Sequence, residues 1–169
     1  MTRRLILLRH AKAEHPHGMA DHVRPLALAG RRQSANVGRA LAEEGLVPDL
    51  VLCSSAVRTR QTWELVQSTL GAPAGSVEYR DEVYEAGAGD LVALLAGVPD
   101  EVDTLLVVGH EPTMSHTAEA LAGPASDPAA FARVRVGVPT ASWSLLETTT
   151  GWSAVTRASM VLARLVTPS

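Results

Sequence analysis

The sequence has almost no cysteine. Cys53 is the only one in 169 residues, so the chain can form no internal disulfide and no zinc site built from several cysteines. A single cysteine is compatible with a reducing compartment, and we therefore expect a cytoplasmic protein.

Positive charge is not in excess, and long apolar runs are missing. The chain has 15 Lys+Arg against 18 Asp+Glu, a net charge of −3, which argues against nucleic acid as a partner because such partners are bound mainly through positive charge. The apolar run at 5–8 ends at Arg9 and is too short for a signal-peptide core. The run at 160–166 contains Arg164 and falls far below the ~20 residues of a membrane span. We expect neither a targeting segment nor a membrane span.

The composition is that of a folded protein. Hydrophobic residues make up 46% of the chain and charged residues 20%, close to the average for globular proteins. A length of 169 residues favours a single domain over residues 1–169.

Three short aliphatic runs alternate with helical patterns. The runs at 5–8, 50–53 and 105–108 are continuous, as is typical of parallel strands covered on both faces. Helical patterns that mostly stop at glycine occupy 31–44, 57–70, 90–95 and 113–121. The alternation predicts an α/β fold, a three-layer α/β/α sandwich around a mostly parallel sheet.

The C-terminal third has a different pattern. Residues 142–148 and 152–157 alternate around Thr150-Gly151, which predicts a hairpin at the edge of the sheet. Residues 124–128 are rich in Pro, Ala, Ser and Asp and predict a surface loop.

Polar residues follow each of the three aliphatic runs. They are Arg9, His10, Ser54, Ser55, Arg58 and His110. Ligands of open α/β sheets bind outside the carboxyl ends of the strands. Two arginines and two histidines suit a phosphoryl group there, because guanidinium groups pair with phosphate oxygens and an imidazole can attack phosphorus. Such chemistry needs no metal and no other cofactor.

These motifs resemble those of a known family. Arg9-His10, the segment Ser-Ser-Ala-Val-Arg-Thr-Arg-Gln-Thr at 54–62 and Gly-His-Glu-Pro at 109–112 resemble, in this order, the histidine phosphatase (phosphoglycerate-mutase-like) superfamily. The segment Asp-His-Val-Arg-Pro-Leu at 21–26, followed by Gly30, resembles the phosphohistidine phosphatase branch that includes SixA.

The resemblance implies roles for five residues. His10 would be the nucleophile that takes the phosphoryl group, and Arg9 and Arg58 would hold its oxygens. His110 would donate a hydrogen bond to the phosphate. Arg24 would either add a positive contact at the rim of the pocket or form a salt bridge with Asp21.

The sequence departs from the family pattern at two positions. Ala11 stands where many members have glycine after the nucleophile, and Glu111 replaces the usual asparagine. We expect Glu111 to point away from the phosphate because of its charge. Some branches use an acidic residue as proton donor. Glu85 is the first candidate for this role here, and Glu82 is the second. The alternative is that both are solvated charges.

The expected function is hydrolysis of a phosphate on an accessible substrate. About twenty residues separate Glu85 from the run at 105–108, too few for the helical cap of larger relatives, so an open pocket is expected. Such a pocket admits phosphohistidine on a phosphotransfer protein, whose imidazole leaves easily. The alternatives are a phosphatase of small-molecule or nucleotide-linked phosphate esters, and a domain that only binds phosphorylated ligands.

Two other chemistries fit the sequence less well. A cysteine phosphatase needs five residues between its cysteine and its arginine. Here four residues lie between Cys53 and Arg58, and six lie between Cys53 and Arg60. The histidines at 10, 15, 17 and 22 crowd into one predicted loop without cysteines or dense carboxylates, so metal binding is disfavoured.

Overall fold

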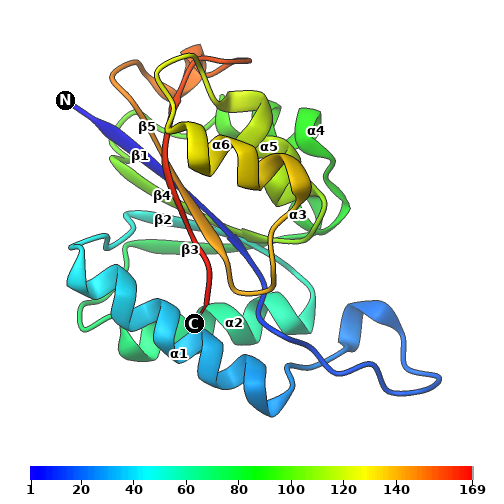
Figure 1. The fold of residues 1–169 in the computed structure, drawn as a ribbon. Coiled ribbons are helices and arrows are strands. Elements are labelled where there is room, and N and C mark those ends of the chain that lie inside the picture. The colour runs from blue at the N-terminus through cyan, green and yellow to red at the C-terminus, as the bar shows by residue number, and fades with distance from the viewer. Residues whose placement is uncertain (169) are drawn as a thin grey trace.

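A six-stranded mixed sheet forms the centre of the protein, and the computed structural model describes residues 1–168 (Figure 1). The strand order is β3-β2-β4-β1-β5-β6. The strands are β1 (Arg3–Arg9), β2 (Leu50–Ser54), β3 (Ser76–Arg80), β4 (Thr104–Gly109), β5 (Trp143–Thr148) and β6 (Val161–Val166). All pairs among β1 to β4 are parallel, whereas β5 pairs antiparallel with both β1 and β6. The predicted mostly parallel α/β sheet is confirmed.

Helices cover both faces of this sheet. They are α1 (Leu28–Glu43), α2 (Val57–Thr69), α3 (Asp81–Glu85), α4 (Ala88–Leu95), α5 (Thr113–Leu121) and α6 (Pro128–Val136), with short 3-10 helices η1 (Asp21–Val23) and η2 (Trp152–Ala154). Figure 1 shows α1 and α2 on one face and α4, α5 and α6 on the other. No helix within residues 1–168 is both long and apolar enough to cross a membrane.

The aliphatic runs fill two separate cores because side chains alternate across a strand. Leu5 and Leu7 of β1 pack in the core under α4, α5 and α6. Ile6 and Leu8 pack in the other core, under α1 and α2. All four are essentially inaccessible to solvent. A strand buried on both faces has no polar position in its middle, so its polar residues gather at its end.

The strand ends lie level with one another. Arg9 pairs with Gly109, and Cys53 pairs with Val108. The backbone N–H of His10 donates to the carbonyl of Gly109 over 3.0 Å. The residues that follow β1, β2 and β4 are therefore neighbours in space.

The C-terminal prediction is correct for the edge hairpin and wrong for its second strand. β6 lies at Val161–Val166, not at residues 152–157. Trp152 is fully buried in the 3-10 turn η2, and its indole N–H donates to the carbonyl of Val102 over 2.7 Å. The alternating pattern predicts a strand here, but burial of the large Trp152 ring stabilises a 3-10 turn instead. The sequence patterns do not predict strand β3 or the helices α3 and α6.

Candidate active site

His10 lies at the end of β1 with its imidazole fixed. It is 7% exposed, and its Nδ1 lies 2.7 Å from the carbonyl oxygen of Ala11. A carbonyl can only accept, so Nδ1 carries the proton and Nε2 presents a lone pair. Burial, followed by the charges of Arg58 and Arg9, lowers the pKa of His10 to about 4. The imidazole is therefore neutral at pH 7.

Arg58, in the first turn of α2, connects the elements of the site. Its Nε donates to Nε2 of His10 over 3.4 Å, and its Nη2 donates to Nδ1 of His110 over 3.2 Å. Nη1 and Nη2 also donate to the backbone oxygen and to Oδ2 of Asp21, over 2.8 and 3.1 Å. The Arg58 side chain is 6% exposed, and these hydrogen bonds place its guanidinium between both histidines and a carboxylate.

His110 follows β4 and faces His10, with 5.3 Å between the ring centroids. Because Nδ1 accepts from Arg58, the proton of the neutral ring sits on Nε2, which donates to Oγ of Ser54 over 2.7 Å. Burial, Arg58 and His10 lower the pKa of His110 to about 3. Both imidazoles are neutral, and a bound phosphate would raise the pKa of each.

Arg9 brings a second guanidinium to the pocket. Its Nη1 donates to the carbonyl of Val138 over 2.8 Å. Its Nε is buried and has no hydrogen-bond partner within residues 1–168. Burial lowers the pKa of Arg9, with a smaller lowering from Arg58 and an opposing effect of Glu111. A buried donor without an acceptor beside a second arginine is suited to an anion.

Asp21 is a member of the site that the sequence reasoning missed. Its Oδ2 accepts from Arg58 and from the hydroxyl of Tyr84, the latter over 2.7 Å. The hydrogen bond from Tyr84, then those from Arg58 and Arg24, hold its pKa far below the usual range. The available signal was the position of Asp21 in the segment 21–26; no local pattern indicated Tyr84.

Arg24 forms the salt bridge with Asp21 that was the second of its two predicted arrangements. Its Nε and Nη2 each lie 3.1 Å from Oδ1 of Asp21, and its Nη1 donates to the carbonyl of Glu14 over 2.9 Å. Its charge still acts on the pocket, because it contributes to lowering the pKa of His10. Arg24 therefore supports Asp21 from the rim.

The structure does not bring Glu85 or Glu82 to the histidines. Both lie in α3, and Glu85 is exposed in a surface cavity that also contains Asp90. Glu82 pairs with Arg80 over 2.5 Å. The residue of α3 that faces the pocket is Tyr84, whose ring centroid lies 5.4 Å from that of His110. Neighbouring helical residues are turned by about 100°, which directs Glu85 elsewhere.

Glu111 does not point freely into solvent. Its Oε1 accepts from the backbone N–H of Ser115, and its Oε2 accepts from that of Val138, both over 2.9 Å. The carbonyl of the same Val138 accepts from Arg9. Glu111 thus joins the start of α5 to the loop that holds Arg9.

The surroundings of Cys53 do not favour a cysteine phosphatase. Cys53 is buried, and burial raises its pKa to about 12, so the reactive thiolate is not formed at neutral pH. Within residues 1–168 no group of three or more His, Cys, Asp or Glu side chains is arranged to hold a metal. His15 and His17 are exposed, whereas His22 lies 2.9 Å from Oγ of Ser55.

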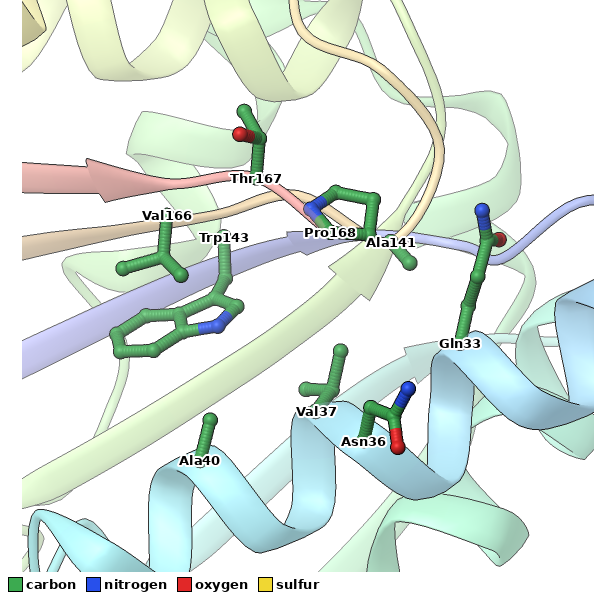
Figure 2. Close-up of a pocket in the computed structure, with 9 residues that line it drawn as sticks. All are labelled: Gln33, Asn36, Val37, Ala40, Ala141, Trp143, Val166, Thr167 and Pro168. Atoms are coloured by element: carbon green, nitrogen blue, oxygen red, sulfur yellow. The ribbon is translucent and has the colours of Figure 1, made fainter.

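A separate cavity of about 160 Å³ lies between α1, β5 and the chain after β6 (Figure 2). It is lined by Gln33, Asn36, Val37, Ala40, Ala141, Trp143, Val166, Thr167 and Pro168. None of the predicted site residues lines it.

Comparisons with known proteins identify the family of this chain. The family model described as Histidine phosphatase superfamily (branch 1) matches residues 5–101. The uncharacterized protein Rv1276c of Mycobacterium tuberculosis is 41% identical over 149 residues, which cover 88% of this chain and 91% of the relative.

Solved structures give the same assignment. A protein of Nakamurella multipartitia, provisionally assigned as a phosphohistidine phosphatase SixA, has a TM-score of 0.86 at 34% identity, covering 99% of this chain and 97% of its own. A protein of Agrobacterium tumefaciens with the same provisional assignment has a TM-score of 0.81 at 31% identity, covering 98% of each chain. The chain belongs to the histidine phosphatase superfamily.

Proposed function

We propose that the protein is a phosphatase that removes the phosphoryl group from phosphohistidine on another protein, through a covalent intermediate on His10 and without a metal. The observation that carries this proposal is the state of the His10 imidazole. The ring is neutral, its Nδ1–H is held by the carbonyl of Ala11, and its Nε2 lone pair faces Arg58. An imidazole in this state is ready to attack phosphorus.

Transfer to the enzyme needs one bond to form and one to break. Nε2 of His10 forms a bond to phosphorus while the P–N bond of the substrate breaks. The substrate, protonated on its other ring nitrogen, leaves as neutral imidazole, so the step requires no side-chain acid. Arg58 and Arg9 bind the phosphoryl oxygens, and the carbonyl of Ala11 stabilises the positive charge that develops on the His10 ring.

Hydrolysis completes the cycle. The oxygen of a water molecule attacks phosphorus, the P–N bond to His10 breaks, and inorganic phosphate leaves after one proton has passed to solvent. Asp21 keeps Arg58 in place in both steps, because it accepts two hydrogen bonds from that guanidinium through its backbone and carboxylate oxygens.

The surroundings of the pocket support a protein substrate. The chain between α3 and β4 forms α4, whose Leu91 and Leu95 are buried in the core against the sheet. This segment therefore covers the sheet and not the pocket. A side chain that projects from another protein could reach His10 from the outside.

Rapid-quench trapping tests the covalent step. With a peptide labelled at phosphohistidine, the wild-type protein should yield an acid-labile, base-stable phosphoenzyme. His10→Ala should trap no label, whereas His15→Ala, which alters an exposed histidine of the neighbouring loop, should trap as much as wild type. Equal labelling of His10→Ala and wild type would refute the assignment.

A substrate panel tests the specificity. The phosphohistidine peptide should give a higher kcat/KM than p-nitrophenyl phosphate, a sugar phosphate or a nucleotide under identical conditions. The highest value for a sugar phosphate or nucleotide would favour the small-molecule alternative. Phosphate binding without any turnover would favour a domain that only binds phosphorylated ligands.

A further inference from the structure

Positive charge is concentrated in the first quarter of the chain. Residues 1–41 contain eight of the 15 Lys+Arg residues but only two of the 18 Asp+Glu. This segment comprises β1, the loop after His10 and most of α1. The start of α1 packs on the loop that follows His10, because the N–H of Ala27 donates to the carbonyl of Lys12.

Four exposed residues define a surface that we name the basic lip. They are Lys12, Leu28, Arg31 and Arg32. The three cations take part in no salt bridge within residues 1–168. Leu28 is 70% exposed. Unpaired cations around an exposed apolar side chain are suited to contact with a protein surface.

The basic lip is fixed relative to the nucleophile. Lys12 lies two residues after His10, and its carbonyl accepts from the N–H of Ala27 over 2.9 Å. Its own N–H donates to Oε1 of Gln33, also over 2.9 Å. A Cβ on Gly30 would lie 2.0 Å from the carbonyl oxygen of Lys12, so only glycine permits this close packing of α1 on the loop.

The charge on the α3 side of the pocket is opposite. Asp81, Glu82, Glu85 and Asp90 are all exposed there, and Tyr84 of α3 contacts both Asp21 and His110 at the pocket. Exposed carboxylates thus lie on α3 and α4, whereas the exposed cations of the basic lip lie on the loop after His10 and on α1. Such a polarity can orient an approaching charged partner.

We infer that the basic lip binds an acidic surface of the protein that presents the phosphorylated side chain. This inference rests on the proposed phosphatase function and names the chemistry of its partner. A phosphoryl group bound by Arg9 and Arg58 leaves the three cations of the lip unused, whereas carboxylates around the phosphorylated residue would pair with them. The partner's apolar contact would be Leu28.

Two histidine-phosphorylated peptides of equal length test the inference, one flanked by glutamates and one by lysines. The wild-type protein should prefer the glutamate-flanked peptide by about 10- to 100-fold in kcat/KM, mainly through KM, as rim charges act on association. This preference should decline as the salt concentration rises. The triple variant Lys12→Glu/Arg31→Glu/Arg32→Glu should lose or reverse it.

A matched variant separates the effect of the basic lip from the effect of the protein's net charge. Arg39→Glu/Arg135→Glu/Arg157→Glu changes the charge equally at three exposed positions outside the lip, and it should keep the wild-type preference. Both triple variants should hydrolyse p-nitrophenyl phosphate within about twofold of wild type and show wild-type circular dichroism. An unchanged peptide preference in the lip variant would overturn the inference. Equal losses on the peptide and on p-nitrophenyl phosphate would also overturn it, because the lip would then act on the pocket.

Binding of the unphosphorylated glutamate-flanked peptide provides a readout that is independent of turnover. Calorimetry should detect binding to wild type and to the matched variant, and at least tenfold weaker binding to the lip variant. Should wild type bind this peptide but hydrolyse no phosphorylated substrate, the proposed function fails while the docking surface stands. Equal binding by all three proteins would refute the docking surface alone.

Discussion

The two sides of the pocket differ in how firmly their side chains are placed. On the side of the strand ends, His10 and Arg58 are buried, and hydrogen bonds fix each of them. On the α3 side, Glu82 and Glu85 are exposed, whereas Tyr84 reaches the pocket. The sheet thus fixes the positions of His10 and Arg58. The five-residue helix α3, in contrast, points successive side chains in different directions.

The two sides of the pocket also differ in what they contribute. Residues at the ends of buried strands carry the groups that can bind and attack a phosphoryl group, because the backbone positions them before the substrate arrives. The α3 side contributes one hydroxyl, which stabilises Asp21, and a field of exposed carboxylates. Changes on the first side should therefore be severe, and changes on the second side mild.

Arg58→Lys should give the largest effect among the following variants. Lysine keeps the charge but cannot reach both histidines and Asp21 with a planar set of donors. We expect kcat/KM for p-nitrophenyl phosphate to fall by roughly 10²- to 10³-fold, the loss that follows removal of one preorganised donor. The exposed Arg39→Lys serves as control. Near-wild-type kinetics of Arg58→Lys would remove Arg58 from the phosphoryl-binding site.

Burial of two neutral histidines should make stability depend on pH. The pKa of His10 is lowered to about 4 and that of His110 to about 3, so between pH 6.5 and these values the unfolded chain binds protons that the native state does not. The free energy of unfolding should therefore fall as the pH falls through this window, by about 1 kcal/mol per histidine between pH 6.5 and 5.5.

Urea unfolding at several pH values measures this dependence. His110→Gln removes one of the two groups and should make the dependence clearly weaker, whereas the exposed His17→Gln should leave it unchanged. A wild-type stability that stays constant from pH 6.5 to 5.5 would contradict the burial of neutral imidazoles.

The sequence predicted most of the sheet and a set of residues, Arg9, His10, Arg58 and His110, that the structure brings close together. Strands buried on both faces are continuous aliphatic runs, and their ends are recognisable wherever Arg9, Ser54 or His110 interrupts them. The parallel arrangement then places these ends at one edge. The pattern thus leads to the polar residues that follow the strands, and the family resemblance singles out Arg9, His10, Arg58 and His110 among them.

The remaining features depend on long-range contacts that no local pattern encodes. Asp21 is a site residue only because η1 lies against α2, where Arg58 reaches both its backbone and its carboxylate oxygens. Likewise, Trp152 could have continued an alternating strand, but burial against Val102 makes it a turn. Glu85 is the candidate proton donor that the resemblance implies, yet the adjacent Tyr84 is the residue of α3 whose ring lies against His110.

Glu111→Gln should give an intermediate effect, because Glu111 lies on the strand-end side but acts through Arg9. Its two carboxylate oxygens accept from Ser115 and Val138, whereas a glutamine offers one acceptor and would direct its amide hydrogens at the other N–H. We expect the inhibition constant of inorganic phosphate to rise by about tenfold, equivalent to one charged hydrogen bond. The exposed Glu43→Gln should leave it unchanged.

The direction of this change is decisive. If Glu111 acted only as a negative charge near the phosphate, its neutralisation would strengthen phosphate binding. Weaker binding means that the carboxylate acts by holding the loop whose Val138 carbonyl accepts from Arg9. A lower inhibition constant for Glu111→Gln would therefore contradict the positioning role.

Glu85→Gln should give the smallest effect, because it changes the α3 side of the pocket, where side chains are held less firmly. The carboxylate of Glu85 is exposed in a cavity away from the histidines, so we expect kcat/KM to stay within about twofold of wild type for both a phosphohistidine peptide and an alkyl phosphate such as glycerol 2-phosphate. Glu82→Gln, which removes only an exposed partner of Arg80, should behave alike. The ratio of the two substrates is the informative quantity, because an alkoxide must be protonated as it leaves, whereas the imidazole of phosphohistidine depends less on a side-chain acid. A selective loss on the alkyl phosphate in Glu85→Gln alone would mean that α3 turns Glu85 toward the leaving group when substrate binds, and that the α3 side takes part in the chemistry after all.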